Sequence, residues 1–136
     1  MTRSMSALAF GSLLLFASGA AAQEWNTLAD VETIQVITHD ADGATRETTV
    51  WLAVYQGHGY IRTGGTRWHA NIERNPDVLV RIRGDEFPLR AVAIAQDDTY
   101  AAVNQVYNQK YGFSDTAIGL FRNLGGPPTI MRLDPR

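Results

Sequence analysis

The chain has 136 residues, with 12 Lys and Arg against 14 Asp and Glu, a net charge of −2 and no cysteine. This weakly acidic balance, without a block of basic residues, argues against nucleic acid or an anionic membrane as the partner. Because no disulfide can form, stability must come from burial of apolar side chains, and we expect a small ligand or a protein as the partner.

The first 22 residues have the pattern of a secretory signal. Arg3 supplies an early positive charge, residues 7–16 are largely apolar, and small residues end the segment. The sequence therefore predicts a signal peptide over residues 1–22, cleaved before Gln23, and a single domain over residues 23–136 in the bacterial periplasm or outside the cell. Retention of the segment as an anchor is the alternative, whereas cleavage would leave no stable membrane span.

Alternating and β-branched stretches predict an antiparallel sheet. Residues 31–38 (VETIQVIT) form the first strand, and a turn at DADG leads into a second strand over residues 48–55 (TTVWLAVY). A turn at QGHG returns the chain into residues 60–63, so these strands are predicted to form a three-stranded meander. A second hairpin and a closing strand are predicted over residues 78–83, 87–94 and 129–133.

Three other stretches have helical character. Residues 68–74 predict a short helix that stops before Asn75-Pro76, because proline disfavours helical geometry in the residue before it. The main helix is predicted near residues 98–111, where apolar and aromatic residues recur at spacings of three and four and Gly112 follows. A second short helix is predicted over residues 114–123. Together these elements predict a mainly β fold, a six-stranded antiparallel barrel with helical insertions.

Metal and nucleophilic chemistry find little support in the sequence. The histidines His39, His58 and His69 include no pair at metal-ligand spacing on one helix face, so we expect no metal site. No cysteine is present, and no Gly-x-Ser-x-Gly stretch presents a nucleophilic serine. The neighbouring carboxylates Asp97 and Asp98 stand where the main helix needs a cap, and we assign them that role.

The stretch TGGTRW is the strongest candidate for a ligand site. It combines two hydroxyls, two glycines that let the backbone approach a ligand closely, a cation and a flat ring. Arg67 opens a helix whose N-terminal amides favour anions, and its guanidinium matches two phosphate oxygens. The stretch predicts a phosphate cradle; the alternative is a turn into a helix with an exposed Arg67 and Trp68 in the core. Its residues are Thr63, Gly64, Gly65, Thr66, Arg67 and Trp68.

Three motifs occur in a fixed order along the chain: RETTVW at residues 46–51, YIRTGGTRW at residues 60–68, and NI followed by NPDV at residues 71–72 and 75–78. This order resembles the FMN-binding split-barrel superfamily, which includes pyridoxamine 5′-phosphate oxidase and deazaflavin-dependent nitroreductases. In that superfamily an Arg-x-Thr motif starts a strand. A second strand ends in Thr or Ser, a Gly- or Ser-rich turn leads to Lys or Arg, and Asn-Leu and Asn-Pro-x-Val follow.

The resemblance implies a homodimeric split barrel that binds FMN or a deazaflavin between its subunits. It also implies a set of residues that contact the phosphate or ribityl chain, or let it approach. These are Arg46, Thr48, Thr63, Thr66 and Arg67, with Gly64 and Gly65 at the close approach; Trp68 would lie against the ring.

Three hypotheses of function follow. The first is a flavin- or deazaflavin-dependent oxidoreductase that passes hydride to or from a small molecule, with the protein supplying position and electrostatics. The second is a non-catalytic periplasmic binding protein for haem, flavin or another planar ligand. The third is an interaction module without a ligand. No residue is assigned a catalytic role, although His69, beside Trp68, is a candidate proton donor.

Overall fold

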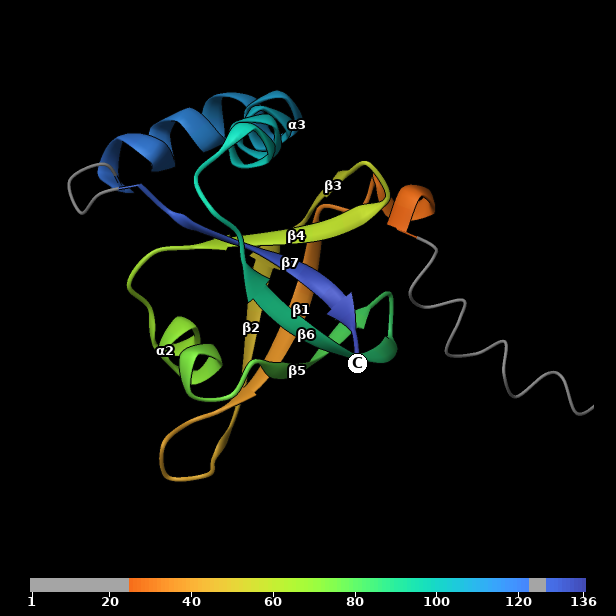
Figure 1. The fold of residues 1–136 in the computed structure, drawn as a ribbon, viewed down its shortest axis with the longest axis vertical. Coiled ribbons are helices and arrows are strands. Elements are labelled where there is room, and N and C mark those ends of the chain that lie inside the picture. The colour runs from red at the N-terminus through yellow and green to blue at the C-terminus, as the bar shows by residue number, and fades with distance from the viewer. Residues whose placement is uncertain (1–24, 123–126) are drawn as a thin grey trace, which may run out of the picture.

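The computed structural model describes residues 25–122 and 127–136, so the predicted signal peptide lies outside the described residues. Within them the chain forms one seven-stranded antiparallel sheet with helical segments packed on it (Figure 1). The mainly β fold class predicted from the sequence is confirmed. In chain order the elements are η2 (Trp25–Leu28), β1 (Thr33–His39), β2 (Thr45–Trp51), β3 (Ala53–Tyr55), β4 (His58–Thr63), α2 (Arg67–Arg74), β5 (Asp77–Ile82), β6 (Asp85–Ala93), α3 (Asp98–Arg122) and β7 (Thr129–Pro135).

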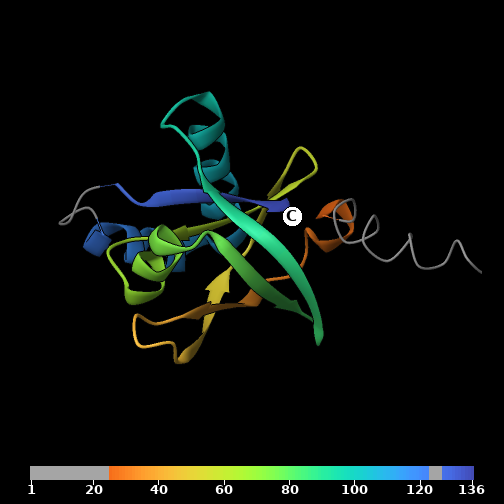
Figure 2. The ribbon, with the colours of Figure 1, turned by 60° about the horizontal axis from the view of Figure 1, so that its bottom comes forward.

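A single residue, Leu52, connects the two edge strands of the sheet. β2 ends at Trp51 and β3 begins at Ala53, yet these strands stand at opposite ends of the order β2-β1-β5-β6-β7-β4-β3. One residue spans only about 3.5 Å, so the sheet curls until its edges meet, as Figure 2 shows from a second side. The sequence predicted six strands, with one of them over residues 48–55; the break at Leu52 divides that run and makes seven.

The predicted hairpins are confirmed, and tight turns set their register. The β3–β4 turn has Gln56 and Gly57 at φ 48° and 78°, and the β5–β6 turn has Arg83 and Gly84 at 52° and 88°. Two successive positive φ angles are typical of type I′ turns, whose twist matches that of paired strands. The β1–β2 and β3–β4 hairpins lie at opposite ends of the strand order, and no ladder joins β2 to β4. The predicted three-stranded meander is therefore wrong: the strand break at Leu52 divides it into two separate hairpins.

The helices begin and end where capping residues allow. α2 follows its N-cap Thr66 and stops at Asn75, before the proline. α3 consists of two helices that meet at Gly112, where φ is 58° and ψ is −131°, so the predicted end of the main helix is confirmed. No helix within residues 25–122 or 127–136 is long and apolar enough to cross a membrane.

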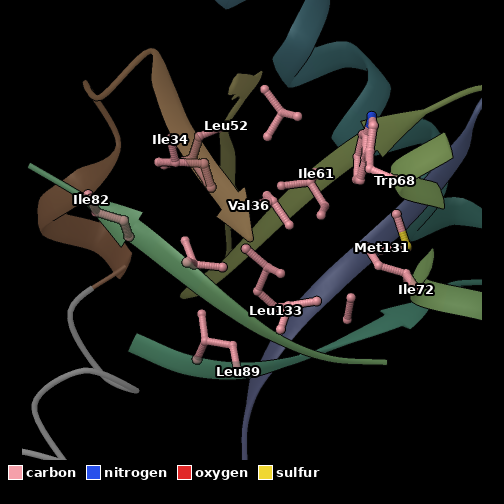
Figure 3. Packing of buried hydrophobic residues seen from close by; sticks show 14 of the residues in the cluster. Ile34, Val36, Leu52, Ile61, Trp68, Ile72, Ile82, Leu89, Met131 and Leu133 are labelled. Atoms are coloured by element: carbon pink, nitrogen blue, oxygen red, sulfur yellow. The ribbon is translucent and has the colours of Figure 1, made fainter. Parts of the chain in front are cut away.

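Two apolar clusters lie on the two faces of the curled sheet. The larger cluster fills the barrel, where Ile34, Ile61 and Leu133 lie among its members (Figure 3). The burial of β5 alternates, so Val78, Val80 and Ile82 point inward. The smaller cluster, with Tyr60 and Tyr107 among its members, packs α3 onto the outer face. Each large apolar side chain that is fully buried contributes about 1.5–3 kcal/mol, which a chain without disulfides needs.

Trp25 closes one part of the barrel core. Its side chain is 2% exposed, and its ring occupies the space where a Cβ on Gly59 would stand, 2.6 Å from the ring carbons Cε3 and Cζ3. Glycine at position 59 therefore lets β4 pass directly beneath the indole.

We expect Gly59→Ala to destabilise the fold by about 1–3 kcal/mol, because the added methyl group overpacks the Trp25 contact. Urea denaturation of the purified domain measures the difference. Gly65→Ala is the matched control, since a Cβ there meets nothing within 4 Å. Equal stability of both variants would contradict the close packing of Trp25 on β4.

Candidate functional site

A pocket of about 390 Å³ lies in the opening of the barrel, between β2 and β4. The β3–β4 ladder ends at the Ala53–Tyr60 pair, while β4 continues to Thr63 along β7. β2 turns away at Leu52 and pairs with β1, so no ladder joins it to β4. The described lining residues are Thr48, Thr49, Val50, Trp51, Arg62, Thr63, Gly64, Thr66, Trp68 and Tyr107.

Strand alternation divides the lining into an inner end and an outer end. Val50 and Trp68 belong to the barrel core, whereas Trp51 packs against the cluster beneath α3 that contains Tyr107. Because successive side chains of a strand point to opposite faces, the pocket passes through the sheet. The inner residues are Thr48, Val50, Thr63 and Trp68, and the outer residues are Thr49, Trp51, Arg62 and Tyr107.

Hydroxyl groups hold the turn that leads into α2. The Oγ1 atoms of Thr63 and Thr66 lie 2.9 Å apart, and Thr63 donates to the carbonyl of Gly64 at 3.1 Å. Thr66 caps the helix by accepting a hydrogen bond from the backbone N–H of His69. The ring Nδ1 of His69 is 3.1 Å from the Gly64 carbonyl, so a proton on Nδ1 closes the turn.

Two side chains of α3 lie at the outer end of the pocket: Tyr107 lines it, and Asn104 contacts Arg62. Arg62 donates from Nη1 to Oδ1 of Asn104 at 3.0 Å, and its guanidinium lies 4.1 Å from the ring centre of Tyr107. The Tyr107 hydroxyl donates to the carbonyls of Trp51 and Tyr60, at 3.0 and 3.1 Å. Helix and strands therefore hold the Arg62 side chain between a hydrogen-bond acceptor and an aromatic face.

The next turn of α3 is hydrogen-bonded to the backbone at Leu52, where β2 ends and β3 begins. Lys110 donates from Nζ to the carbonyls of Val31 and Leu52, and Tyr111 donates from its hydroxyl to Leu52 at 2.6 Å. The Tyr111 ring also stacks on Trp51, with 4.3 Å between centroids and 4° between planes. Burial lowers the pKa of Lys110. These contacts fix the position of Trp51, which lines the pocket.

Comparison with known proteins identifies the architecture. No family model and no curated protein matches the sequence. Among solved structures, the chain is similar to HutZ, the heme storage protein from Vibrio cholerae, with a TM-score of 0.63 over 88% of this chain and 90% of that one at 16% identity. It is also similar to the conserved hypothetical protein Rv2991 from Mycobacterium tuberculosis, with a TM-score of 0.65 over 99% and 86% of the chains at 16% identity.

An F420-H2 dependent reductase, FDR-A, matches with a TM-score of 0.62 over 76% of this chain and 95% of that one, at 12% identity. The chain therefore shares the fold of these proteins, a split barrel. The resemblance predicted from its motifs is thereby confirmed as a likeness of fold. The same split barrel occurs in proteins described as a reductase and as a heme storage protein.

The split barrel brings five of the predicted site residues together in the pocket and places three elsewhere. Gly65 is exposed in the turn and does not line the pocket. Arg46 binds Asp40 through two hydrogen bonds, Nε to Oδ1 at 2.8 Å and Nη2 to Oδ2 at 3.0 Å. Arg67 lines a separate groove with Asp40 and Asp42. The five residues in the pocket are Thr48, Thr63, Gly64, Thr66 and Trp68.

Asp40 organises the groove beside α2. It accepts a hydrogen bond from Asn71 as well as from Arg46, and Asn71 also donates to Thr38 at 3.0 Å. The hydrogen bonds from Arg46 and Asn71 lower the pKa of Asp40 from 3.8 to about 2. This network ties α2 to the β1–β2 hairpin, and in it Arg46 has a structural role.

Sequence reasoning missed five residues of the pocket. Thr49, Val50 and Trp51 follow the predicted Thr48 on one strand, so strand continuation was a usable signal. Arg62 lies directly before Thr63 within the motif YIRTGGTRW, but its place in the strand gives no sign of a site. Tyr107 belongs to a helix far along the chain, and no local pattern connects it with β2.

We expect Asp40→Asn to remove an acid-sensitive part of the stability. The folded pKa of Asp40 lies below its unfolded value, so its contribution is complete above pH 3.8 and is lost as the pH falls towards about 2. Urea denaturation across this interval should show a smaller loss of stability in Asp40→Asn than in the wild type. Asp42→Asn is the control, because it keeps the side-chain oxygen that accepts from Ala44. Equal pH dependence of all three proteins would contradict the role of Asp40.

We expect Tyr107→Phe to destabilise the domain by about 1–3 kcal/mol, because the Trp51 and Tyr60 carbonyls lose their shared donor. Tyr55→Phe removes a hydroxyl from the neighbouring strand β3 and is the matched control. Thermal unfolding of both variants tests the anchoring of α3, which would be disproved by equal transition temperatures.

Proposed function

We propose that this split barrel binds a planar cofactor, a flavin or deazaflavin, in the pocket between β2 and β4 and acts as an oxidoreductase on a small molecule. The observation that carries the proposal is the opening of the barrel itself, where aromatic rings and hydroxyls from four elements line one pocket. Concave sites with apolar walls and a few polar groups are the usual form of a cofactor site.

The lining fits a flavin-like group. Trp51 and Trp68 offer aromatic surface at the outer and inner ends, and the threonine hydroxyls offer donors and acceptors to a polar chain. When bound, such a cofactor supplies the hydride chemistry. The residues of this chain orient the ring and exclude water from it, while α3 keeps Trp51 and Tyr107 in place.

The residue types at the pocket favour a flavin or deazaflavin over haem. Haem iron is usually held by His, Cys, Met or Tyr, and among the described lining residues only Tyr107 is of these types. Its hydroxyl donates to the Trp51 and Tyr60 carbonyls, so it is directed at the backbone. A flavin needs no such ligand.

The comparisons support both the reductase and the alternative. The similarity to the F420-H2 dependent reductase supports the oxidoreductase. The similarity to HutZ, a heme storage protein that this chain covers over 90% of its length, supports a non-catalytic binding protein for haem or another planar ligand as the second candidate. We further propose a homodimer with the pocket at its interface, and export to the periplasm after cleavage of residues 1–22.

We expect purified mature protein to take up FMN or F420 and to give the absorbance spectrum of the bound cofactor. Thr49→Phe should abolish uptake without unfolding the domain, because Thr49 is exposed and lines the pocket. Thr45→Phe is the matched control on the same face of β2 and does not line this pocket. Uptake of haemin alone would favour the second candidate, and no uptake of any of the three ligands would contradict the proposal.

A further inference from the structure

We propose that Trp51, backed by the ring of Tyr111, is the platform on which the ring system of the ligand stacks, and that Trp68 is not. The inference rests on the proposed function, because it assumes a ring-bearing ligand in the pocket between β2 and β4. It names the side chain that selects a planar ligand and the direction in which that ligand lies.

The Trp51 indole is supported on one face by a second aromatic ring. It stacks on Tyr111, with 4.3 Å between centroids and 4° between planes. Trp51 is partly exposed and lines the pocket, so surface that Tyr111 leaves uncovered borders the cavity. Stacked aromatic rings attract one another beyond the gain from burying their area. A planar ligand at this end of the pocket therefore extends a stack that the fold already contains.

Hydrogen bonds fix the backbone that carries the indole. The Tyr107 hydroxyl donates to the carbonyl of Trp51 at 3.0 Å, and the Tyr111 hydroxyl donates to the carbonyl of Leu52 at 2.6 Å. Lys110 donates to the same Leu52 carbonyl at 2.9 Å. A rigid ring held in this way loses little conformational freedom when a ligand stacks on it, which favours affinity.

Trp68, the tryptophan that the superfamily resemblance implies for the ring, is committed to the core. It is 7% exposed and lies on the buried face of α2 with Asn71 and Ile72. Figure 3 shows it among the side chains that fill the barrel. Trp68 therefore closes the inner end of the pocket but leaves too little surface for a ring to stack on.

The hydroxyls of the turn into α2 determine which part of the ligand lies there. Thr63 donates its hydroxyl proton to the Gly64 carbonyl, so Thr66 must be the donor in the 2.9 Å contact between the two Oγ1 atoms. Both protons are thereby used, and each oxygen keeps a lone pair that accepts. This turn suits a chain of hydroxyl groups, such as the ribityl chain of a flavin. The ring then lies on Trp51, and the chain runs towards the turn.

Affinity for ring ligands tests the platform. Dissociation constants for FMN, F420 and haemin are measured by fluorescence or absorbance titration. We expect Trp51→Leu to weaken binding by about 5- to 100-fold, the effect of removing one stacking ring. Trp51→Phe should weaken it less, because it keeps a smaller ring. The matched change Trp68→Phe should weaken it less than Trp51→Phe does, whereas an equal or larger loss would overturn the assignment.

Fluorescence gives a readout that a purely structural role of Trp51 would not move. An indole stacked on a flavin ring quenches the emission of the flavin. We expect quenched emission from a flavin bound to the wild type or to Trp68→Phe, and recovered emission in Trp51→Leu. Thermal unfolding shows which variants are folded, and Trp51→Phe carries the comparison if Trp51→Leu is not. Equal emission from the flavin in all folded variants would overturn the platform.

A ligand pair tests the direction of the ligand. Riboflavin and lumiflavin share the isoalloxazine ring, and lumiflavin has a methyl group in place of the ribityl chain. Because the platform contacts only the ring, Trp51→Leu should weaken the binding of both by the same factor. A loss confined to riboflavin would overturn the assignment of Trp51 to the ring.

Failure of the proposed function gives a different result. If the wild type binds a ring ligand and Trp51→Leu binds it equally well, the platform is overturned and the proposed function stands. If haemin is the one ligand bound, a loss of its binding in Trp51→Leu would support the platform in the second candidate function. No binding of any of the ring ligands by the wild type would overturn both proposals.

Discussion

Leu52 carries the chain from one edge of the sheet to the other, and the rest of the structure depends on that connection. Its side chain is fully buried, its backbone N–H donates to the carbonyl of Glu32, and its carbonyl accepts from Lys110 and Tyr111. A strand that leaves the ladder exposes backbone groups that other residues must satisfy. Here the Glu32 carbonyl, directly before β1, and two side chains of α3 satisfy them, so the break is a stable part of the fold.

The break explains why the pocket and helix α3 belong together. The chain leaves β2 at Leu52 and pairs with β4 only as β3, so no ladder joins β2 to β4. The barrel is therefore open between these two strands, where a continuous strand would have closed it. Tyr107 of α3, which binds the Trp51 carbonyl beside the break, also lines the outer end of the pocket. The hydrogen bonds to these backbone carbonyls and the shape of the pocket therefore both follow from the strand break at Leu52.

The positions of the arginines follow a similar logic. A cation near an aspartate in a folded chain pairs with it, as Arg46 does with Asp40. Arg67 opens α2 as the sequence indicates, but the β1–β2 hairpin brings Asp40 and Asp42 to the same groove. Arg62 lies on the outer face of β4, where it donates to Asn104 and lies over the Tyr107 ring, and it lines the pocket. Residue type alone does not distinguish these three environments.

Local patterns in the sequence determined the strands, the hairpin turns, the capped start of α2 and the end of the main helix at Gly112. Alternation, turn chemistry and capping act between residues close in sequence, so the sequence alone expresses them. The sequence also contains the order of motifs from which the split barrel was predicted. Five of the eight site residues predicted from it line the pocket.

Only the tertiary structure decided that residues 48–55 form two strands, because the break at Leu52 depends on the Glu32 carbonyl as an acceptor and on donors from α3 more than fifty residues away. Only the fold placed Tyr107 and Arg62 in the pocket and Arg46 on Asp40, since these contacts depend on how distant segments pack rather than on their neighbours in sequence.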